Sequence, residues 1–405
     1  MSGKPGMRWA SALSLDPSSD LALSETATAL HARLNARPDV LFVFVSPHHR
    51  AHYDQILAGV HKKLGATHVL GCSGAGVVGG GHEAENVPAL ALTAAVLPDV
   101  AVQPVRLEDA KLPDADGAPR LWEQAVGVAA AAKPHFVLLA DPFSIRLDEM
   151  LAGFDFAFPE AVKIGGVASG CFGPGQSALF LNDRLHREGA VGLAFSGKLQ
   201  IDTLVARGCR PVGKPMPVTR SHRNVLLELD RQPVTEVLGR LFSKANERER
   251  KLMREALFVG VVRDPFMLEA PGPDDFLVRR VVGMDAERGA LAVGTLLQDG
   301  QLVQFHICDA VTADEDLATV LQRYTEDRLL AEETGAWPPL PQGALLFTCM
   351  SRGMRLYGRP DHDSRAFFTE LGDVPLGGFF CNGEISPAGG STHIHGFTSC
   401  FGIFR

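Results

Sequence analysis

The sequence predicts an α/β (α+β) protein of two packed halves, in which mixed β-sheets are covered by helices. Two observations predict this class. Hydrophobic residues make up 46% of the 405 residues and charged residues 21%, which is the composition of a folded protein with a large core. Buried-strand patterns also alternate with amphipathic helical patterns, and this order typically gives a sheet with a covering layer of helices.

The first strand and helix patterns lie in the N-terminal quarter of the chain. Val40–Val45 (VLFVFV) is apolar throughout, as a buried strand is, and His49–Leu64 has apolar residues on one helical face. Thr67–Gly71 predicts a short strand. A glycine-rich loop follows, and Ala89–Val96 predicts the closing strand.

The same order recurs twice along the chain. The second copy has one predicted helix and three predicted strands, namely Ile145–Phe154 with His135–Ala140, Val162–Gly166 and Ala190–Phe195. The third copy has the same content, namely Ser364–Leu371 with Ala344–Thr348, Val374–Phe380 and Gly396–Phe404. We interpret this as an internal repeat of strand, helix, strand, glycine loop and strand.

The region between the second and third copies has a different pattern. It contains four strand-like runs, Asn224–Leu229, Phe276–Val282, Leu291–Thr295 and Leu302–Ile307. It also contains three helical patterns, Val234–Phe242, Ala245–Leu257 and Thr312–Glu333. A turn-rich link, GCRPVGKPMPV, opens this region, so we place a domain boundary near residue 200 that divides the chain into residues 1–200 and 201–405.

Charge and cysteine usage exclude several classes of protein. The net charge is −8 with both signs interspersed, which argues against binding to nucleic acid or to a membrane surface through bulk charge. No apolar run reaches the ~18 residues that a membrane span needs. Seven scattered cysteines without a C-x-x-C pair favour free thiols over a disulfide framework or a zinc site. We therefore expect a cytoplasmic protein without membrane insertion.

The stretch GCSGAGVVGGGHE contains Gly74–Gly79, a formal match to G-x-G-x-x-G. A dinucleotide-binding turn needs a helix directly after these glycines, whereas two more glycines and a proline follow here. We therefore expect no dinucleotide and no other cofactor. Two interpretations remain: the glycines let strands cross closely, or the loops of the three copies converge and present N–H groups to a small ligand.

Several motifs point to a known family. The C-terminal ones are Cys349 with Ser351-Arg352-Gly353, Asp361-His362-Asp363, Leu376-Gly377-Gly378-Phe379-Phe380, Asn382-Gly383-Glu384-Ile385 and His395-Gly396-Phe397-Thr398. The N-terminal half adds Gly71-Cys72-Ser73, Gly165-Gly166 and Phe180-Leu181-Asn182-Asp183. Through these motifs nearly the whole chain resembles FIST proteins, the F-box and intracellular signal transduction family, in their bacterial stand-alone form.

The resemblance implies a FIST N-terminal domain in residues 1–200 and a FIST C-terminal domain in residues 201–405. It implies a sensory, signal-transduction protein that binds a small ligand, for which amino acids are suggested; we expect an amino acid or a small carboxylate. The chain has no room for an output domain, so we expect any signal to pass to a separate partner protein.

The residues that we expect around the ligand lie in the three glycine loops and after the strands of the third copy. They are Cys72, Ser73, Gly74, Ser169, Cys349, Arg352, Gly353, Cys381, Asn382, Gly383 and Glu384. Arg352 fits either a bidentate grip on a ligand carboxylate or a salt bridge with Asp361 or Asp363. Glu384 fits either a partner for a ligand amino group or an exposed acid in a turn.

Cys349 and Cys381 end two strands that we expect to pair, so they either face one cavity or are buried, inert cysteines. Our leading hypothesis is a sensor without catalysis. A second is a hydrolase or transferase with Cys349 or Cys381 as nucleophile and His362 or His395 as base. A third is a protein-interaction scaffold that uses the charged helix Ala245–Leu257. The two histidine clusters match no metal-ligand spacing, so we expect no metal at His48, His49 and His52 or at His393 and His395.

Overall fold

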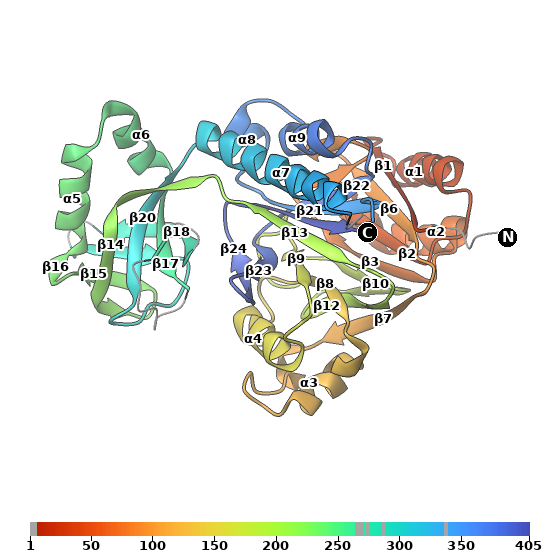
Figure 1. Cartoon of the computed structure of the whole chain (residues 1–405), viewed down its shortest axis with the longest axis horizontal. Coiled ribbons are helices and arrows are strands. Elements are labelled where there is room, and N and C mark those ends of the chain that lie inside the picture. The colour runs from red at the N-terminus through yellow and green to blue at the C-terminus, as the bar shows by residue number, and fades with distance from the viewer. Residues whose placement is uncertain (1–5, 264–270, 273–274, 286–287, 336–338) are drawn as a thin grey trace. The chain divides into compact units, whose positions relative to one another are not determined.

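The computed structural model describes residues 6–263, 271–272, 275–285, 288–335 and 339–405, and it confirms the α+β class (Figure 1). The chain forms two compact units. Unit 1 holds the chain up to Ala206 together with Leu317–Ile394 and Thr398–Arg405, and unit 2 holds Arg207–Asp316 and His395–Phe397. All three predicted copies therefore contribute to unit 1. The proposed domain boundary near residue 200 stays a prediction.

Each copy in unit 1 is longer than predicted, because a further strand and helix precede it. The first copy is β1 (Arg8–Ser14), α1 (Ser19–Leu34), β2 (Val40–Val45), η1 (Pro47–His52), α2 (Tyr53–Leu64), β3 (His68–Ser73), β4 (Gly76–Gly79), β5 (His82–Glu85) and β6 (Leu90–Val96). The second copy is β7 (Val100–Leu107), η2 (Asp109–Lys111), α3 (Pro119–Val126), η3 (Ala130–Ala132), β8 (His135–Ala140), α4 (Leu147–Ala157), β9 (Lys163–Val167), β10 (Leu179–Leu181), β11 (Arg184–His186) and β12 (Ala190–Gly197).

The third copy has the same order, with the chain of unit 2 inserted after its first strand. It consists of β13 (Ile201–Ala206), the part of α7 (Ala310–Glu333) that begins at Leu317, β21 (Gly343–Cys349), α8 (Met354–Tyr357), α9 (His362–Leu371), β22 (Leu376–Cys381), β23 (Glu384–Ala388), β24 (Ser391–His395) and β25 (Ser399–Phe404). Each strand and helix predicted for the three copies is present with a shift of a few residues at most.

The glycine loops predicted in the first and third copies are wrong, because both segments form β-hairpins. The turns are Gly80-Gly81, with φ of 57° and 90°, and Gly389-Gly390, with φ of 57° and 87°. Glycine adopts these conformations without steric cost, and two-residue turns of this kind match the twist of paired strands. The residues after Gly79 therefore continue as β5 and not as a helix, in agreement with the exclusion of a dinucleotide turn.

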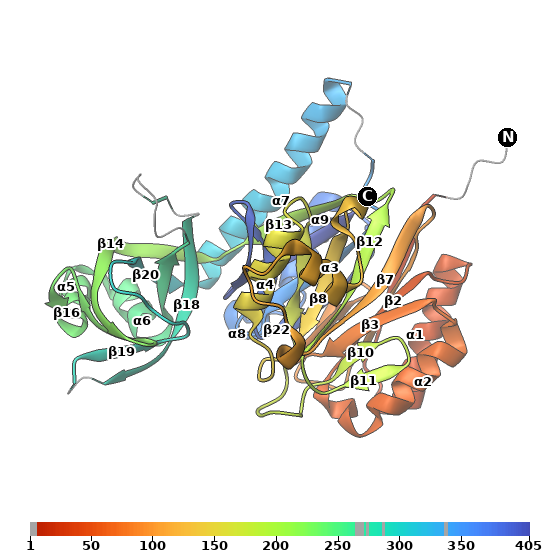
Figure 2. The same cartoon turned by 90° about the horizontal axis from the view of Figure 1, so that it is seen from below.

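Each hairpin completes the sheet of another copy. The strand orders are β1-β6-β2-β3-β10-β11, β24-β23-β9-β8-β12-β7 and β13-β25-β21-β22-β4-β5. The hairpin of the second copy thus extends the sheet of the first, that of the third extends the second, and that of the first extends the third. Figure 2 shows β10 and β11 beside β3 at the edge of the first sheet. This exchange ties the three copies into a closed ring.

The three sheets share one core and carry separate helix layers. Their inner faces meet in a cluster that includes Phe42, Phe44, Phe347 and Phe379. On the outer faces, α1 and α2 pack on the first sheet, α3 and α4 on the second, and α7 and α9 on the third. The central strand β2 is buried on both faces, which explains its unbroken apolar sequence.

In its described residues, unit 2 contains a seven-stranded sheet, the helices α5 and α6, and the part of α7 that ends at Asp316. Its elements are β14 (Cys209–His222), β15 (Val225–Leu229), β16 (Gln232–Pro233), α5 (Val234–Lys244), α6 (Glu247–Glu255), β17 (Leu257–Val262), β18 (Phe276–Asp285), β19 (Ala290–Val293) and β20 (Leu302–Cys308). The charged segment predicted at residues 245–257 is α6, a solvated helix that begins with a capping box at Asn246 and Glu249.

The expectation that all cysteines are free is wrong, because Cys209 and Cys308 form a disulfide in unit 2. The two residues are 99 positions apart in the sequence and lie directly opposite each other on the antiparallel strands β14 and β20. Their spacing along the chain gave no sign of this pairing. The other five cysteines are free thiols.

Equivalent glycines of the repeat let the central parallel strands approach each other. In all three copies the residue opposite the middle of the second strand (β2, β8 or β21) is a glycine, namely Gly71 opposite Val43, Gly165 opposite Leu138 and Gly378 opposite Leu346. A Cβ atom at Gly378 would lie 1.9 Å from the carbonyl oxygen of Leu346, and its φ of +153° also disfavours a side chain. A side chain here would push two core strands apart.

We predict that Gly378→Ala destabilises the protein by about 3 kcal/mol or more, because overpacking against backbone cannot relax by a side-chain movement. Gly239→Ala is the matched control, since a Cβ atom there meets no heavy atom within 4 Å. Thermal unfolding of both variants measures the difference. Equal stability of Gly378→Ala and the wild type would contradict the required close approach.

Candidate functional site

The structure brings the predicted loop residues of the three copies together. The Ser169 N–H donates to the carbonyl oxygen of Ser73 at 3.2 Å, and the Ser169 hydroxyl donates to the carbonyl oxygen of Phe380. The N–H of Val167 donates to the Gly383 carbonyl oxygen at 2.9 Å, and the Asn382 N–H donates to that of Val167 at 3.0 Å. Direct backbone contacts therefore join the ends of β3, β9 and β22.

Most side chains at this junction are buried against protein atoms. Cys72, Ser73, Ser169 and Cys381 are at most 2% exposed, Gly74 is buried, and Asn382 is exposed. A Cβ atom at Gly166 would lie 2.4 Å from the Cys381 sulfur, so the thiol is packed against backbone. Burial raises the pKa of the Cys72 and Cys381 thiols well above their usual value. The predicted pairing of the two strands that end at Cys349 and Cys381 is confirmed by the register of β21 and β22.

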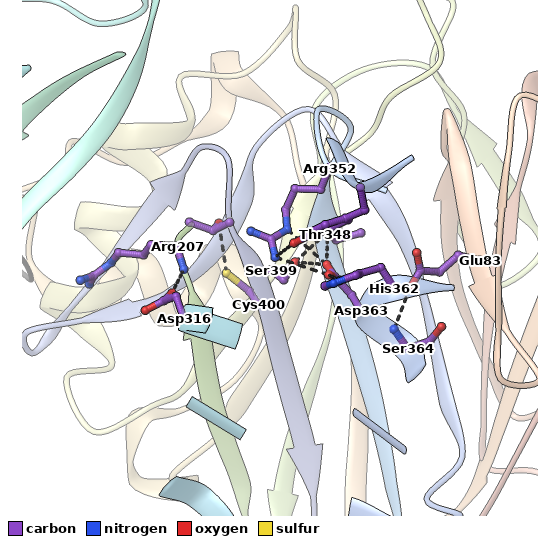
Figure 3. Close-up of polar contacts among 12 residues, drawn as sticks. Glu83, Arg207, Asp316, Thr348, Arg352, His362, Asp363, Ser364, Ser399 and Cys400 are labelled. Atoms are coloured by element: carbon purple, nitrogen blue, oxygen red, sulfur yellow. Dashed lines mark hydrogen bonds and ion pairs between the residues drawn. The ribbon is translucent and has the colours of Figure 1, made fainter. Parts of the chain in front are cut away.

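A buried network of charged and polar side chains surrounds Asp363, and we call Thr348, Arg352, His362, Asp363 and Ser399 the polar corner (Figure 3). Arg352 Nε lies 3.2 Å from Asp363 Oδ2, and both side chains are at most 2% exposed. Thr348 donates to Oδ2 at 3.1 Å, the Ser399 hydroxyl donates to the same oxygen, and His362 Nδ1 lies 3.0 Å from Oδ1. The salt bridge between Arg352 and Asp363 is thus the alternative that the structure shows.

The polar corner stabilises the ionised form of the Asp363 carboxyl group. Burial alone would raise the pKa of the Asp363 carboxyl, but Arg352 and the hydrogen bonds from His362 and Ser399 hold it well below its usual value. The Arg352 guanidinium also donates to the Tyr357 hydroxyl at 2.6 Å, and the Tyr357 ring stacks on His362 with centroids 3.4 Å apart. These contacts fix the charged pair and the histidine in one arrangement.

The other two copies have apolar residues where the polar corner has hydroxyl groups. Thr348 pairs with Ser399 across β21 and β25. By register the equivalent pairs are Val45 with Leu90 and Ala140 with Ala190. A buried ion pair is often no more stabilising than apolar residues of similar volume. The fold therefore does not require hydroxyl groups at these two positions, and their use around Asp363 in the third copy points to a function.

Glu384 is a second buried carboxyl group, which excludes the exposed turn acid considered from the sequence. It is 0% exposed, and Oε2 accepts from the Thr398 hydroxyl at 2.7 Å, whereas Oε1 has no hydrogen-bond partner among the described residues. Burial raises the pKa of Glu384 to about 8. By register its equivalents are apolar in the other copies, Val77 opposite Phe379 and Leu179 opposite Cys72.

A pocket of about 570 Å³ lies in unit 1 beside the polar corner, between β1, α1, β5 and the segment before α9. Leu13, Leu15 and Val87 contribute apolar surface to its wall. The polar groups that line it are Arg33, His82, Glu83, Glu85 and Asp361. A pocket of this size, largely apolar and with a few charged groups of both signs, is typical of small-ligand sites.

Backbone and side-chain contacts hold the charged wall in place. Asp361 accepts from the Glu83 N–H at 2.7 Å, and its other oxygen lies 3.0 Å from His82 Nδ1. Glu85 accepts from the Met354 N–H at 2.8 Å. A Cβ atom at Gly353, where φ is +63°, would lie 2.2 Å from the Glu85 carboxylate, so this glycine lets the carboxylate reach the backbone.

Glu83 connects the pocket to the polar corner. It lines the pocket, and its Oε1 accepts from the N–H of Ser364 at 2.7 Å, the residue directly after Asp363 (Figure 3). A change at the pocket wall therefore reaches the first turn of α9 through a single hydrogen bond.

The pocket was not found from the sequence. Of the predicted ligand residues only Gly353 adjoins its wall, and Arg33, Glu83 and Glu85 were missed. The available signal was Glu83 and Glu85, two positions apart in a strand and therefore on one face. Glu83 and Glu85 share a face only if their segment is a strand of a hairpin, whereas the sequence predicts a loop there.

The described residues contain no group of three or more His, Cys, Asp or Glu side chains that could hold a metal ion. In the same part of the chain no helix has the length and apolar character needed to cross a membrane. His395 belongs to unit 2, whereas Cys349, Cys381 and His362 belong to unit 1.

Comparisons with known proteins assign both halves of the chain. The FIST N domain model matches residues 39–232, and the FIST C domain model matches residues 235–387. An uncharacterized protein of Mycobacterium tuberculosis strain H37Rv is 33% identical over 388 residues, which cover 95% of this chain and 97% of that protein. An uncharacterized protein of Mycobacterium bovis is 32% identical over 358 residues, which cover 88% of each.

Among solved structures, the cyanuric acid hydrolase from A. caulinodans aligns with 98% of this chain and 99% of its own, at 10% identity and a TM-score of 0.33. A likeness of this size supports no statement about the fold or activity of this chain.

We predict that Glu384→Gln stabilises the protein increasingly as pH rises. The folded state keeps Glu384 protonated up to a pKa of about 8, while the unfolded chain ionises it near pH 4.5. The wild type therefore loses about 1.4 kcal/mol per pH unit through this group between these two values, and glutamine does not titrate. Urea unfolding at pH 5, 6.5 and 8 measures the difference; a difference that does not change with pH would contradict the assignment.

Proposed function

The chain belongs to the FIST family, and from this premise we propose that it is a sensor without catalysis that binds an amino acid or a small carboxylate in the pocket beside the polar corner. FIST domains are sensory, signal-transduction domains. The observation that carries the proposal is the buried ion pair of Arg352 and Asp363 in the third copy, next to a pocket of ligand size.

The charges of the pocket wall match those of an amino acid. Arg33 offers a guanidinium, which donates one hydrogen bond to the carbonyl oxygen of Ser11 at 2.8 Å and has further N–H groups that suit a carboxylate. Glu85 and Asp361 offer carboxylates that suit an ammonium group. Leu13, Leu15 and Val87 would contact an apolar side chain of the ligand.

A cysteine-dependent hydrolase or transferase has weaker support. A nucleophilic cysteine needs a thiolate in a partly exposed, electropositive position. Burial raises the pKa of Cys381, which is the opposite of activation. Cys349 is half-buried, so its burial gives no comparable argument against a reactive thiol.

The output of the sensor would be a separate partner protein, as expected from the sequence. We also propose a cytoplasmic location. The five free cysteines support it, whereas the disulfide between Cys209 and Cys308 is of a kind that cytoplasmic proteins rarely keep.

A thermal-shift screen tests the proposal. The panel contains the standard amino acids together with amines and carboxylates that share the carbon skeletons of alanine, leucine and phenylalanine. We expect saturable stabilisation by at least one member, and a ligand at about 100 times its Kd adds about 2.7 kcal/mol. Glu85→Gln and Arg33→Met should each weaken binding at least about tenfold, because each removes one charge of the wall.

Glu160→Gln is the control, since Glu160 lies in an exposed ion pair with Lys133 and does not line the pocket. Absence of stabilisation by every member of the panel would refute ligand binding of this class. Unchanged affinity in both Glu85→Gln and Arg33→Met would refute the assignment of the site.

A further inference from the structure

Glu83 occupies an unfavourable position for a carboxyl group. It is only 7% exposed, it lines the pocket, and its Oε2 has no hydrogen-bond partner among the described residues. Leaving a buried carboxyl oxygen without a partner destabilises the folded protein. A hydrogen-bond donor that reaches this oxygen would therefore be favourable, and because Oε2 is closed to solvent in the free protein, such a contact requires the side chain to turn toward the pocket.

The fold does not require a carboxyl group here. Register makes Glu83 equivalent to Leu185, because Glu83 pairs with Val78, which lies opposite Gly378, and Leu185 pairs with Phe180, which lies opposite Gly71. Leu185 packs against the apolar cluster beneath α1 and α2. The second copy thus fills the position with a leucine, so the carboxyl group of the first copy calls for a functional reason.

The surroundings of Glu83 disfavour its negative charge. On its own strand lie His82 and Glu85, before α9 lies Asp361, on α9 lies Asp363, and on α1 lies Arg33. Asp363 forms an ion pair with Arg352 within the polar corner and keeps its negative charge. Burial raises the pKa of Glu83 to about 8, and the negative charges of Asp363 and Glu85 add to this, against the hydrogen bond from the Ser364 backbone. Near neutral pH the group is therefore an uncharged carboxylic acid.

We infer that Glu83 recognises the ammonium group of the ligand and gives up its proton when that ligand binds. This inference rests on the proposed function and narrows it to ligands with a primary ammonium group, such as amino acids and amines, and excludes simple carboxylates. No covalent bond forms between protein and ligand. The O–H bond at Glu83 breaks, its proton passes to the solvent, and the resulting carboxylate pairs with the ammonium group that replaces the proton.

This replacement of a proton by an ammonium group explains how the free protein can keep a buried carboxyl group at Glu83. In the free protein the proton removes a buried charge that has no partner, and a cation within about 4–6 Å favours the ionised form once it is present. A carboxylate without an ammonium group provides no such cation and would leave the proton in place. Oε1 accepts a hydrogen bond from the Ser364 N–H in the first turn of α9. Ionisation of Glu83 strengthens this hydrogen bond, which joins the pocket to the polar corner.

Isothermal titration calorimetry of the full chain tests this inference, with the panel members that bind in the thermal-shift screen as probes. Titrations at pH 7 in two buffers of different ionisation enthalpy count the protons released. We expect about one proton per bound amine or amino acid, and an affinity that rises about tenfold per pH unit between pH 6 and 7.5. The matched carboxylates should bind without proton release or not at all.

Glu83→Gln is the informative variant, because glutamine keeps an acceptor for the Ser364 N–H and cannot release a proton. We expect it to lose the proton release and the pH dependence, whereas Glu160→Gln retains both. The proton count of the wild type does not depend on the folding of any variant.

The outcomes separate the two proposals. Ammonium ligands that bind without proton release, or carboxylates that bind as tightly as their amino counterparts, would overturn the role of Glu83 and leave the sensor intact. Unchanged proton release in Glu83→Gln would overturn it as well. If no panel member binds, the proposed function fails and this inference fails with it.

Discussion

Unit 1 depends on the pairing of each copy's hairpin with the sheet of another copy. Without β4 and β5 the third sheet would end at β22, and the edges of the other two sheets would be open in the same way. An open edge leaves a row of unpaired N–H and C=O groups. The ring of exchanged hairpins therefore makes the three copies a single folded body, and it also decides which residues of distant copies become neighbours.

The candidate site is a consequence of that exchange. The β4–β5 hairpin carries Glu83 and Glu85 from the first copy to the start of α9 in the third, where Asp361 and Asp363 lie. Because the three copies have nearly the same fold, the residues at equivalent positions of two copies show which residue types the fold accepts in the other. Val45, Leu90 and Leu185 show that apolar residues satisfy the fold at the positions of Thr348, Ser399 and Glu83, so these three polar groups have a purpose other than folding.

The sequence predicted the repeated elements well and the contacts between them poorly. Val40–Val45 and His135–Ala140 were found with their observed bounds, because central strands buried on both faces are continuously apolar. β1 and α1 were missed because serine and alanine dilute their apolar pattern. The Gly80-Gly81 turn carried a hairpin signal, which we interpreted as a loop because the flanking segments contain more glycine and charge than most strands.

The site was predicted only in part for a related reason. The ligand-binding role expected for Arg352, Gly353 and Glu384 stays a prediction, because burial and partners decide what such residues do, and these follow from pairing between copies. The partner of Arg352 was one of two alternatives that the sequence could not separate. Glu83 accepts a hydrogen bond from Ser364, which is 281 positions away, and Cys308 forms a disulfide with Cys209, which is 99 positions away. No local sequence pattern predicts contacts over such separations.

The central claim is that the ligand binds at the corner where the first and third copies meet, and not at the junction of the three loops. A crystal structure of the protein with an amino acid bound tests it most directly. The account predicts ligand density in the pocket, with the ammonium group within hydrogen-bond distance of Glu83 Oε2. Density between Ser73, Ser169 and Asn382, with an empty pocket beside Glu83, would contradict it.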